Sequence, residues 1–242
     1  MRTVYILLGL LLISCAQKET PLVRDQNPAA AGFDALGSDP AAIELADSIM
    51  HAMGGRKAWD KVRYISWNAV GRDIIYDKEA DRVRIVHGDT ICLLTSAGTG
   101  RIQIKGVEMV ESEALSSLLE SFHTAWRIDF YDLLLPFALK SSGVTIRYMG
   151  EDSLSGQRFN SLILTFQKQP DQYKLYVDKQ TKLVRFGAYY QNAGTEQATR
   201  IHPWDNYQNV NEIQLSANRS DGHGPMKVKV DKDLPEKLFN EF

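Results

Sequence analysis

One stretch in the middle of the chain departs from the pattern on either side of it: residues 111–137 read ESEALSSLLESFHTAWRIDFYDLLLPF. In its first part, 111–126, apolar side chains recur at helical spacing and form one stripe of an amphipathic helix. The second part, 128–137, is apolar on almost every side, and Pro136 is expected to break or kink the helix there. We therefore expect a helical insertion with enough apolar surface to fill or cover the inside of a sheet.

The sequence around this insertion alternates apolar and polar residues with a period of two, which is typical of half-buried strands. Before the insertion the alternation is found at 65–69, 83–87 and 102–107. After it, the expected strands are 144–149, 159–166, 173–178, 183–190, 212–219 and 226–230. Strands that follow one another along the chain predict a mainly β (α+β) fold. We expect a single large curved antiparallel sheet, an incomplete β-barrel whose inner face must be covered.

A helix is expected before the first strand. Pro40 and the two residues before it can start a helix, and apolar side chains recur at helical spacing from Ile43 to Met53. Gly54 and Gly55 end this helix, since glycine accepts the left-handed conformation of a helix C-terminus. The expected architecture is thus an N-terminal helix, a curved sheet, and a mid-chain helical insertion that acts as a plug or lid.

The first residues have the layout of a secretory signal peptide: one positive charge, an apolar run at 4–13, and the small residue Ser14. The apolar run is shorter than the roughly 20 residues that span a bilayer. The sequence LISC, which ends at Cys15, resembles a lipobox, the site at which bacterial lipoprotein signal peptides are cut before a lipidated cysteine. We expect a signal peptide at 1–14, a lipidated Cys15 with a flexible tether at 15–38, and one domain at 39–242.

Charge and cysteine content narrow the classes of function. Lys and Arg number 28 against 30 Asp and Glu, a net charge of −2, so there is no basic excess to attract nucleic acid. Once Cys15 carries lipid, Cys92 has no disulfide partner, and the apolar run around Cys92 predicts a buried, unreactive thiol. Apart from the covalent lipid on Cys15, no cofactor is expected.

No local catalytic or metal-binding motif is found. The five histidines show no HExxH spacing, and the chain lacks both GxSxG and the phosphate-binding sequence GxxxxGK[ST]. We therefore predict no catalytic residue, no metal site and no enzyme activity. A hydrolase whose residues converge from separate strands stays open as a third hypothesis.

Several expected strands are apolar on both faces, notably 159–166 and 183–190. Two interpretations stay open: an ordinary core covered by helices, or a sheet curved around an apolar ligand cavity. Residues 202–207 (HPWDNY) either gate such a cavity or, as we favour, pack as a loop. If there is a cavity, the candidate lining and lid residues are Trp67, Ile85, Ile104, Ile146, Leu164 and Phe186 on strands and Leu115, Leu118, Phe122, Trp126, Phe130 and Leu134 on the insertion.

The order of lipobox, tether, helix, strands, helical insertion and further strands resembles the LolA/LolB-like fold of periplasmic carriers and lipoproteins. The hairpin at 173–184 (YKLYVDKQTKLV) is similar to one that recurs in this superfamily. Residues 53–59 (MGGRKAW) and 62–67 (VRYISW) resemble a group of uncharacterised bacterial lipoproteins. The resemblance implies an incomplete barrel whose helices plug or cover an apolar hollow, in which several members bind acyl chains. It assigns no role to a single residue.

The sequence therefore predicts a membrane-anchored lipoprotein that binds an apolar ligand in a half-barrel cavity: a lipid, an acyl chain or a lipoprotein segment. The alternative is a structural or interaction lipoprotein, in which the core is filled and the surface recruits a cell-envelope protein. The predicted location is the cell envelope. Ala16 after Cys15 favours the outer membrane, with the domain facing the periplasm or the cell surface.

Overall fold

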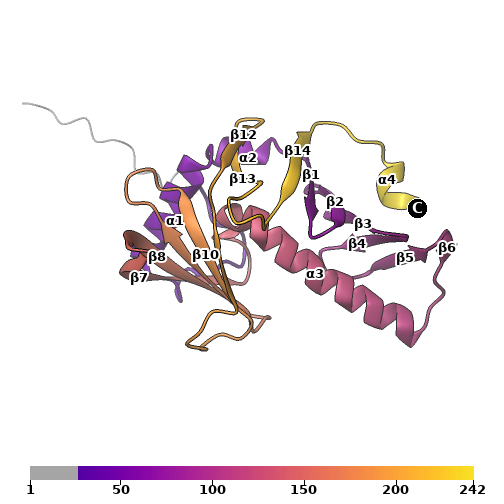
Figure 1. The fold of residues 1–242 in the computed structure, drawn as a ribbon, viewed down its shortest axis with the longest axis horizontal. Coiled ribbons are helices and arrows are strands. Elements are labelled where there is room, and N and C mark those ends of the chain that lie inside the picture. Colours follow the sequence, from indigo (N-terminus) through magenta and orange to yellow (C-terminus); the bar gives the residue numbers. More distant parts are fainter. Residues whose placement is uncertain (1–26) are drawn as a thin grey trace, which may run out of the picture.

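The computed structural model describes residues 27–242, so the predictions for the signal peptide, for Cys15 and for the first part of the tether lie outside the described residues. Helices α1 (Pro40–Ala52) and α2 (Arg56–Asp60) come first, where the N-terminal helix is expected. The long helix α3 (Glu113–Ala138) occupies the middle of the chain, and α4 (Lys237–Asn240) lies at its end (Figure 1).

The strands before α3 are β1 (Tyr64–Ala69), β2 (Arg72–Asp77), β3 (Arg82–His87), β4 (Thr90–Thr95), β5 (Gly100–Ile104) and β6 (Val107–Glu108). The strands after it are β7 (Val144–Leu154), β8 (Gln157–Phe166), β9 (Gln172–Val177), β10 (Val184–Tyr190), β11 (Arg200–Pro203), β12 (Tyr207–Val210), β13 (Ile213–Ser216) and β14 (Met226–Asp231). One sheet has seven strands in the order β14-β1-β2-β3-β4-β5-β6, and a second has five in the order β11-β10-β9-β8-β7. β12 and β13 pair only with each other.

This architecture confirms a mainly β fold with a large antiparallel sheet that does not close into a barrel. The strands do not form one uninterrupted ladder, because α3 separates β6 from β7 and the chain starts a second sheet after it. The last strand, β14, returns to the first sheet and pairs with β1, where Val230 lies opposite Ile65. The sheet expected from the sequence is thus divided into two, and α3 contributes to the core of both.

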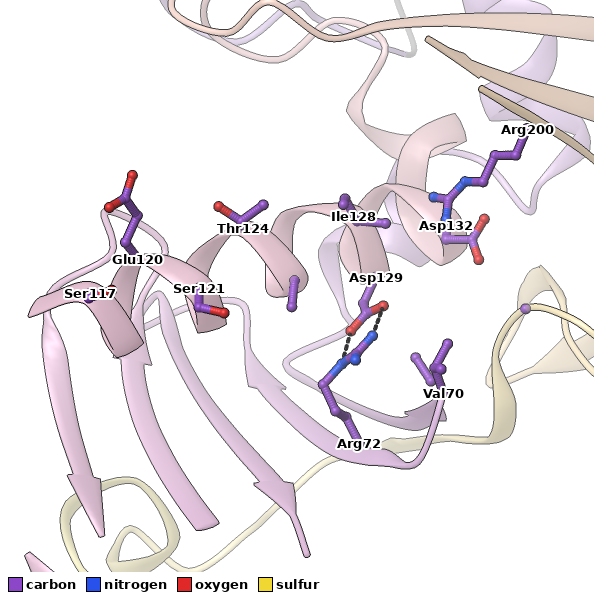
Figure 2. Close-up of a pocket in the computed structure, with 13 residues that line it drawn as sticks. Val70, Arg72, Ser117, Glu120, Ser121, Thr124, Ile128, Asp129, Asp132 and Arg200 are labelled. Carbon is purple, nitrogen blue, oxygen red and sulfur yellow. Dashed lines mark hydrogen bonds and ion pairs between the residues drawn. The ribbon is translucent and has the colours of Figure 1, made fainter. Parts of the chain in front are cut away.

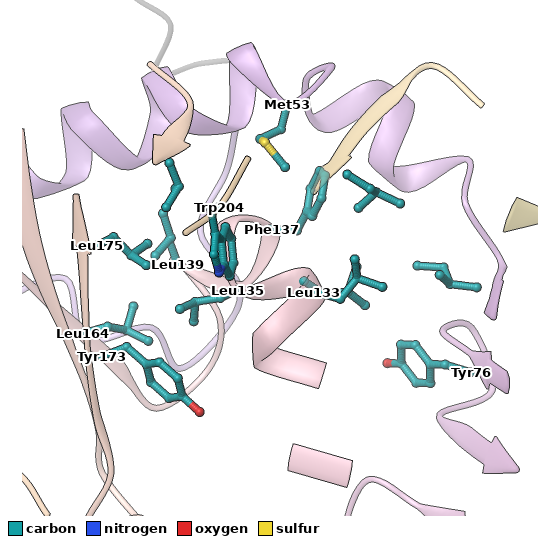
Figure 3. Packing of buried hydrophobic residues seen from close by; sticks show 14 of the residues in the cluster. Met53, Tyr76, Leu133, Leu135, Phe137, Leu139, Leu164, Tyr173, Leu175 and Trp204 are labelled. Atoms are coloured by element: carbon teal, nitrogen blue, oxygen red, sulfur yellow. The ribbon is translucent and has the colours of Figure 1, made fainter. Parts of the chain in front are cut away.

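The main hydrophobic core surrounds the second half of α3 (Figure 3). Leu135 lies on the side of the five-stranded sheet, near Leu175 and Trp204, whereas Leu133 lies on the side of Tyr76 in β2. The mid-chain helix expected inside the curve is therefore the central element of the core.

The C-terminal segment covers the other face of the seven-stranded sheet. The ring of Phe239 in α4 stacks on Tyr64 with 5.9 Å between the centroids. Arg84 donates hydrogen bonds to the backbone carbonyls of Leu238 and Glu241, at 2.9 and 2.7 Å. A ligand of this sheet must therefore approach from the α3 side.

Residues 27–38, which the sequence assigns to the tether, lie against the domain. The side chain of Asn27 donates to the Asp47 carboxylate at 2.8 Å, and Lys140 binds the same carboxylate at 2.7 Å. The amide of Gly143 donates to the carbonyl of Gly32 at 2.8 Å. The described part of the predicted tether is therefore attached to α1 and to the end of α3, because its backbone and side chains find partners there.

Candidate ligand-binding site

The C-terminal half of α3, residues 126–138, is the most deeply buried part of this helix. It contains eight of the nine buried residues of α3. Leu133, Leu134 and Leu135 are each exposed by 1% or less. Full burial of one leucine contributes roughly 1.5–3 kcal/mol, so this half is held firmly by apolar contacts alone.

Aromatic rings extend these contacts to both sheets. The ring of Trp126 lies 5.7 Å from that of Trp67 on β1. On the opposite side, the ring of Tyr131 lies 4.9 Å from Phe166 on β8 and 5.5 Å from Tyr173 on β9. Such offset and tilted ring pairs add to the energy of burial. The C-terminal half of α3 therefore connects the two sheets.

Ion pairs hold the same half of the helix. Arg72 on β2 donates two hydrogen bonds to Asp129, at 2.7 and 2.8 Å (Figure 2), and the two side chains are only 18% and 5% exposed. Burial raises the pKa of Asp129, and the hydrogen bonds from Arg72 act against that rise, so the carboxylate depends on Arg72 for its charge. The other pairs are Arg127 with Asp171 at 3.1 Å and Arg219 with Asp132 at 3.2 Å.

Pro136 lies inside α3, and the helix continues through it to Ala138. Proline has no backbone N–H, so the carbonyl of Asp132, four residues earlier, has no helical donor. The guanidinium of Arg219 donates to this carbonyl as well as to the Asp132 carboxylate. The helix is not broken at Pro136, because a side chain from the loop before β14 replaces the missing donor.

The N-terminal half of α3, residues 113–125, is attached more weakly. Phe122 is its one buried residue. Its other large apolar side chains are half-buried: Leu115, Leu118 and Leu119. Ser112 caps the helix by accepting a hydrogen bond from the Leu115 amide at 3.3 Å, and Nε2 of His123 lies 2.8 Å from the carbonyl oxygen of Ser96. This half therefore rests on the seven-stranded sheet with few strong contacts.

A cleft of about 600 Å³ runs along one flank of α3 (Figure 2). Three hydroxyls from the N-terminal half line it, those of Ser117, Ser121 and Thr124. Charged and small or branched apolar side chains line the rest, and Arg200 and Asp132 lie together at one end (Figure 2). We call this space the polar cleft; it is lined by Ala69, Val70, Arg72, Ser117, Glu120, Ser121, Thr124, Ala125, Ile128, Asp129, Asp132, Arg200 and Gly224.

A second cleft, of about 310 Å³, lies on another flank of α3 and is lined by more aromatic residues. Four rings face it, and we call it the aromatic cleft: Tyr76, Trp126, Phe130 and Tyr131, with Asp81, Ser96, His123, Arg127, Ala138, Ser141 and Gln169 around them. A narrow space of about 10 Å³ lies between α3 and the five-stranded sheet. We call it the tyrosine slot; it is lined by Tyr131, Asp132, Leu135, Tyr173, Leu175, Gly187, Tyr189, Arg200, His202 and Trp204.

These three spaces share lining residues. Arg200 and Asp132 belong both to the polar cleft and to the tyrosine slot. Tyr131 belongs both to the slot and to the aromatic cleft. The slot therefore adjoins both clefts, on the side of the C-terminal half of α3.

The structure brings eleven of the twelve sequence-predicted lining and lid residues into the main core. Seven of them are buried: Trp67, Ile85, Phe122, Trp126, Leu134, Ile146 and Leu164. Four are half-buried at its margin: Ile104, Leu115, Leu118 and Phe130. They fill the inside of the fold rather than line an empty hollow. Trp126 and Phe130 also reach the aromatic cleft, and Leu115 lines a further cleft of about 590 Å³.

Phe186 lies on the other face of the five-stranded sheet, so its assignment to the inner face is wrong. It packs in a separate cluster with Phe159 and Tyr176. The pairing of β10 with β9 shifts its register between Val184 and Phe186. Because a bulge adds one residue to the strand, the alternation reverses there, and Val184 belongs to the main core while Phe186 does not.

No sequence motif identifies the polar residues of the site. Arg72 and Asp129 are 57 residues apart in sequence, and no local spacing links them. Arg200 lies on the short strand β11, outside every strand expected from alternation. The available signal is the presence of two charged residues, Asp129 and Asp132, in the otherwise apolar sequence 128–137.

Other potentially reactive groups of the described residues are a thiol and a histidine–aspartate pair. Cys92 is fully buried, and burial raises its pKa to about 12, in agreement with the expected unreactive thiol. His202 and Asp221 are in contact at 2.8 Å on the surface. Within residues 27–242, no three His, Cys, Asp or Glu side chains gather in a way that would hold a metal ion. In the same part of the chain, none of the helices has both the length and the apolar character needed to cross a membrane.

The chain matches no protein-family model and no curated protein sequence. Among solved structures it is similar to a DUF1329 family protein from Desulfovibrio piger, with a TM-score of 0.46 and 14% identity over 84% of this chain and 98% of that one. It is also similar to a putative outer membrane lipoprotein-sorting protein domain from Vibrio parahaemolyticus, with a TM-score of 0.39 and 8% identity over 81% and 97% of the two chains.

A third similar structure is the lipoprotein LppX from Mycobacterium tuberculosis, with a TM-score of 0.26 and 12% identity over 63% of this chain and 88% of that one. Similarity at this level assigns neither a ligand nor an activity to the chain.

Proposed function

We propose that this protein is a membrane-anchored lipoprotein of the cell envelope that binds an apolar or amphipathic molecule beside α3. The aromatic cleft carries this proposal. Four rings, from Tyr76, Trp126, Phe130 and Tyr131, line about 310 Å³ of open space between α3 and the sheets. Ligand sites in proteins have volumes of roughly 300–1,000 Å³ and are lined mainly by apolar and aromatic groups.

The weak attachment of the N-terminal half of α3 supports a role in binding. Its half-buried leucines cover the inner face of the seven-stranded sheet near β4 and β5. If this half moves outward, a longer apolar chain reaches Phe122 and the strand residues beneath it. Each Å² of apolar surface removed from water in this way contributes about 25 cal/mol.

The filled core favours a second candidate function. Leu133 and Leu134 are fully buried at the centre of the half-barrel, and the larger of the two clefts is lined by charged and hydroxyl groups as well as by apolar side chains. A protein with such a core acts through its surface, as an interaction lipoprotein that recruits a cell-envelope partner. This candidate predicts that the purified protein binds no lipid.

Native mass spectrometry of residues 16–242, purified without detergent from a bacterial host, separates the two candidates. The first predicts an adduct with the mass of a lipid that disappears on organic extraction. The second predicts the mass of the bare polypeptide and no uptake of a fluorescent fatty acid.

Two matched phenylalanine variants then locate the site. Phe130 faces the aromatic cleft, whereas Phe186 is also half-buried but lies on the far face of the five-stranded sheet. We expect Phe130→Ala to weaken binding of a fluorescent fatty acid roughly tenfold, the equivalent of about 1.4 kcal/mol. Phe186→Ala is expected to leave the affinity unchanged. Equal losses in both variants would exclude the aromatic cleft as the site.

A further inference from the structure

One row of side chains crosses the five-stranded sheet beneath α3. The register places Arg200 of β11 opposite Tyr189 of β10, and Tyr189 opposite Tyr173 of β9. Residues directly opposite each other in a sheet project from the same face. The Arg200 guanidinium accordingly lies 5.0 Å from the Tyr189 ring, which lies 5.1 Å from the Tyr173 ring. The row leads from the polar cleft into the tyrosine slot.

Two groups in this row lack a hydrogen-bonding or ionic partner. The hydroxyl of Tyr173 belongs to a side chain that is 5% exposed, and it makes no hydrogen bond with any residue among 27–242. A buried hydroxyl without a partner costs roughly 1–3 kcal/mol. Arg200 forms no ion pair with an acidic residue in the same part of the chain. Both groups are hydrogen-bond donors that line one slot.

The acidic groups nearby are already neutralised. Asp129 is bound by Arg72, and Asp132 by Arg219. Glu120, which also lines the polar cleft, lies twelve residues along α3 from Asp132, or about 18 Å at the rise of an α-helix. Arg200 also lies beside Asp132 and attracts Asp129 (Figure 2), but it is the third arginine around these two carboxylates, so the mouth of the slot carries an excess of positive charge.

We infer that Arg200 and Tyr173 form a binding site for the anionic head of an amphipathic ligand, a carboxylate or a phosphate. This inference rests on the proposed function, because it places the apolar tail of the same ligand along the tyrosine slot. Arg200 binds the head in the polar cleft, and the Tyr173 hydroxyl donates to the oxygen that lies deepest. The tail runs past Tyr131 towards the aromatic cleft, and Tyr131 must turn aside to admit it.

The test uses the mature chain, residues 15–242, produced without its leader so that no acyl chain is attached. The probes are cis-parinaric acid and its uncharged methyl ester, which share one fluorescent tail. We expect the acid to bind more tightly than the ester. Arg200→Gln should weaken binding of the acid roughly 10- to 100-fold, as expected for hydrogen bonds to a charged group. Tyr173→Phe should weaken it roughly 2- to 10-fold, and neither variant should change the affinity for the ester.

Arg185→Gln is the matched control, because Arg185 is an exposed arginine on the neighbouring strand β10 and lines neither the slot nor the polar cleft. It removes the same charge from the same sheet and should leave the affinity for both probes unchanged. Competition with dodecyl phosphate and with inorganic phosphate separates a lipid head from a free anion. An amphipathic site requires displacement by dodecyl phosphate at concentrations where inorganic phosphate has no effect.

Four results would overturn the inference. If the unaltered chain binds acid and ester equally well and Arg200→Gln has no effect, there is no anion site, but the proposed function is not contradicted. An equal loss for both probes in Arg200→Gln shows that Arg200 supports the fold instead. Displacement by inorganic phosphate alone indicates a free-anion site. If neither probe binds the unaltered chain, the proposed function fails together with the inference.

Discussion

The two halves of α3 are of equal length, yet they are held in different ways. The C-terminal half is buried between two sheets and bound by ion pairs to both β2 and the loop before β14. The N-terminal half contacts one sheet only, through leucines that are half exposed. One continuous helix therefore combines a deeply buried half with a half that has few buried side chains.

The sequence of a single helical stripe explains the difference. Positions 117, 121, 124, 128, 131 and 135 follow one another at steps of four and three residues, so they share one side of α3. In the N-terminal half this stripe is Ser117, Ser121 and Thr124, which line the polar cleft. In the C-terminal half it continues as Tyr131 and Leu135, which line the tyrosine slot against the five-stranded sheet. The side chains of this stripe change from polar to apolar where α3 comes into contact with the five-stranded sheet.

The largest effect is expected from truncating a leucine in the buried half. Leu134→Ala should lower the free energy of unfolding by roughly 2–5 kcal/mol, since the cavity it leaves is enclosed. Leu118→Ala removes the same atoms from the N-terminal half, where the side chain is only half-buried, and should cost about 1 kcal/mol or less. Urea unfolding of both variants measures the two losses. Similar values would show that the halves are equally anchored.

A smaller loss is expected when the buried ion pair is broken. Asp129→Ala leaves Arg72 without its partner and should cost about 3 kcal/mol. Replacing both residues by leucine leaves no unpaired charge, so this double variant should lose much less than the sum of the single losses. Glu120→Ala, an exposed carboxylate of the other half, serves as the control and should cost no more than about 0.5 kcal/mol. If the stability losses caused by replacing Arg72 and Asp129 singly simply add up in the double variant, the two side chains do not stabilise the fold as an ion pair.

Opening of the N-terminal half alone should require a still smaller free energy. The rate at which a thiol reagent modifies Cys92 on β4 should measure this opening. Burial raises the pKa of the Cys92 thiol to about 12. A thiol reagent should therefore modify Cys92 mainly in an opened state, where the thiol has its ordinary pKa of about 8.5. The labelling rate should rise with pH up to about 9 and then level off. At low urea it should be independent of urea concentration. A rate that keeps rising towards pH 12 would indicate direct attack on the closed state.

The smallest effect is expected at the helix cap. Ser112→Ala removes the acceptor for the Leu115 amide and should destabilise the first turn by about 1 kcal/mol. Hydrogen exchange should then speed up several-fold for the amides of residues 113–118, with no change for residues 130–135. Equal acceleration in both segments would mean that α3 opens as one unit.

The sequence predicts those parts of the fold in which periodicity is regular. The stripe of α3 and the alternation in β1 and β3 are regular, and the structure has a helix and strands there. β2 does not alternate, because Tyr76 and the charged residue Asp77 are both buried, and it is absent from the expected strands. Asp77 is buried because Arg82 binds it at 2.8 Å, a pairing that periodicity does not reveal.

The site is less predictable than the fold, because its residues meet only through the register of the strands. Phe186 is misplaced by a single extra residue in β10. Arg200 and Tyr173 become neighbours through Tyr189, on a strand between theirs. Sequence periodicity identifies the apolar residues around α3, but it does not show which charged residues form ion pairs with each other.

The proline in α3 has a consequence for the order in which the molecule is completed. The Asp132 carbonyl that Pro136 leaves without a helical donor is bound by Arg219, 87 residues further along the chain. The edge strand β1 likewise stays unpaired on one side until β14 arrives from residues 226–231. A chain synthesised from its N-terminus therefore lacks both contacts until its last tenth is made. The complete set of hydrogen bonds of α3 and of the first sheet depends on these late residues.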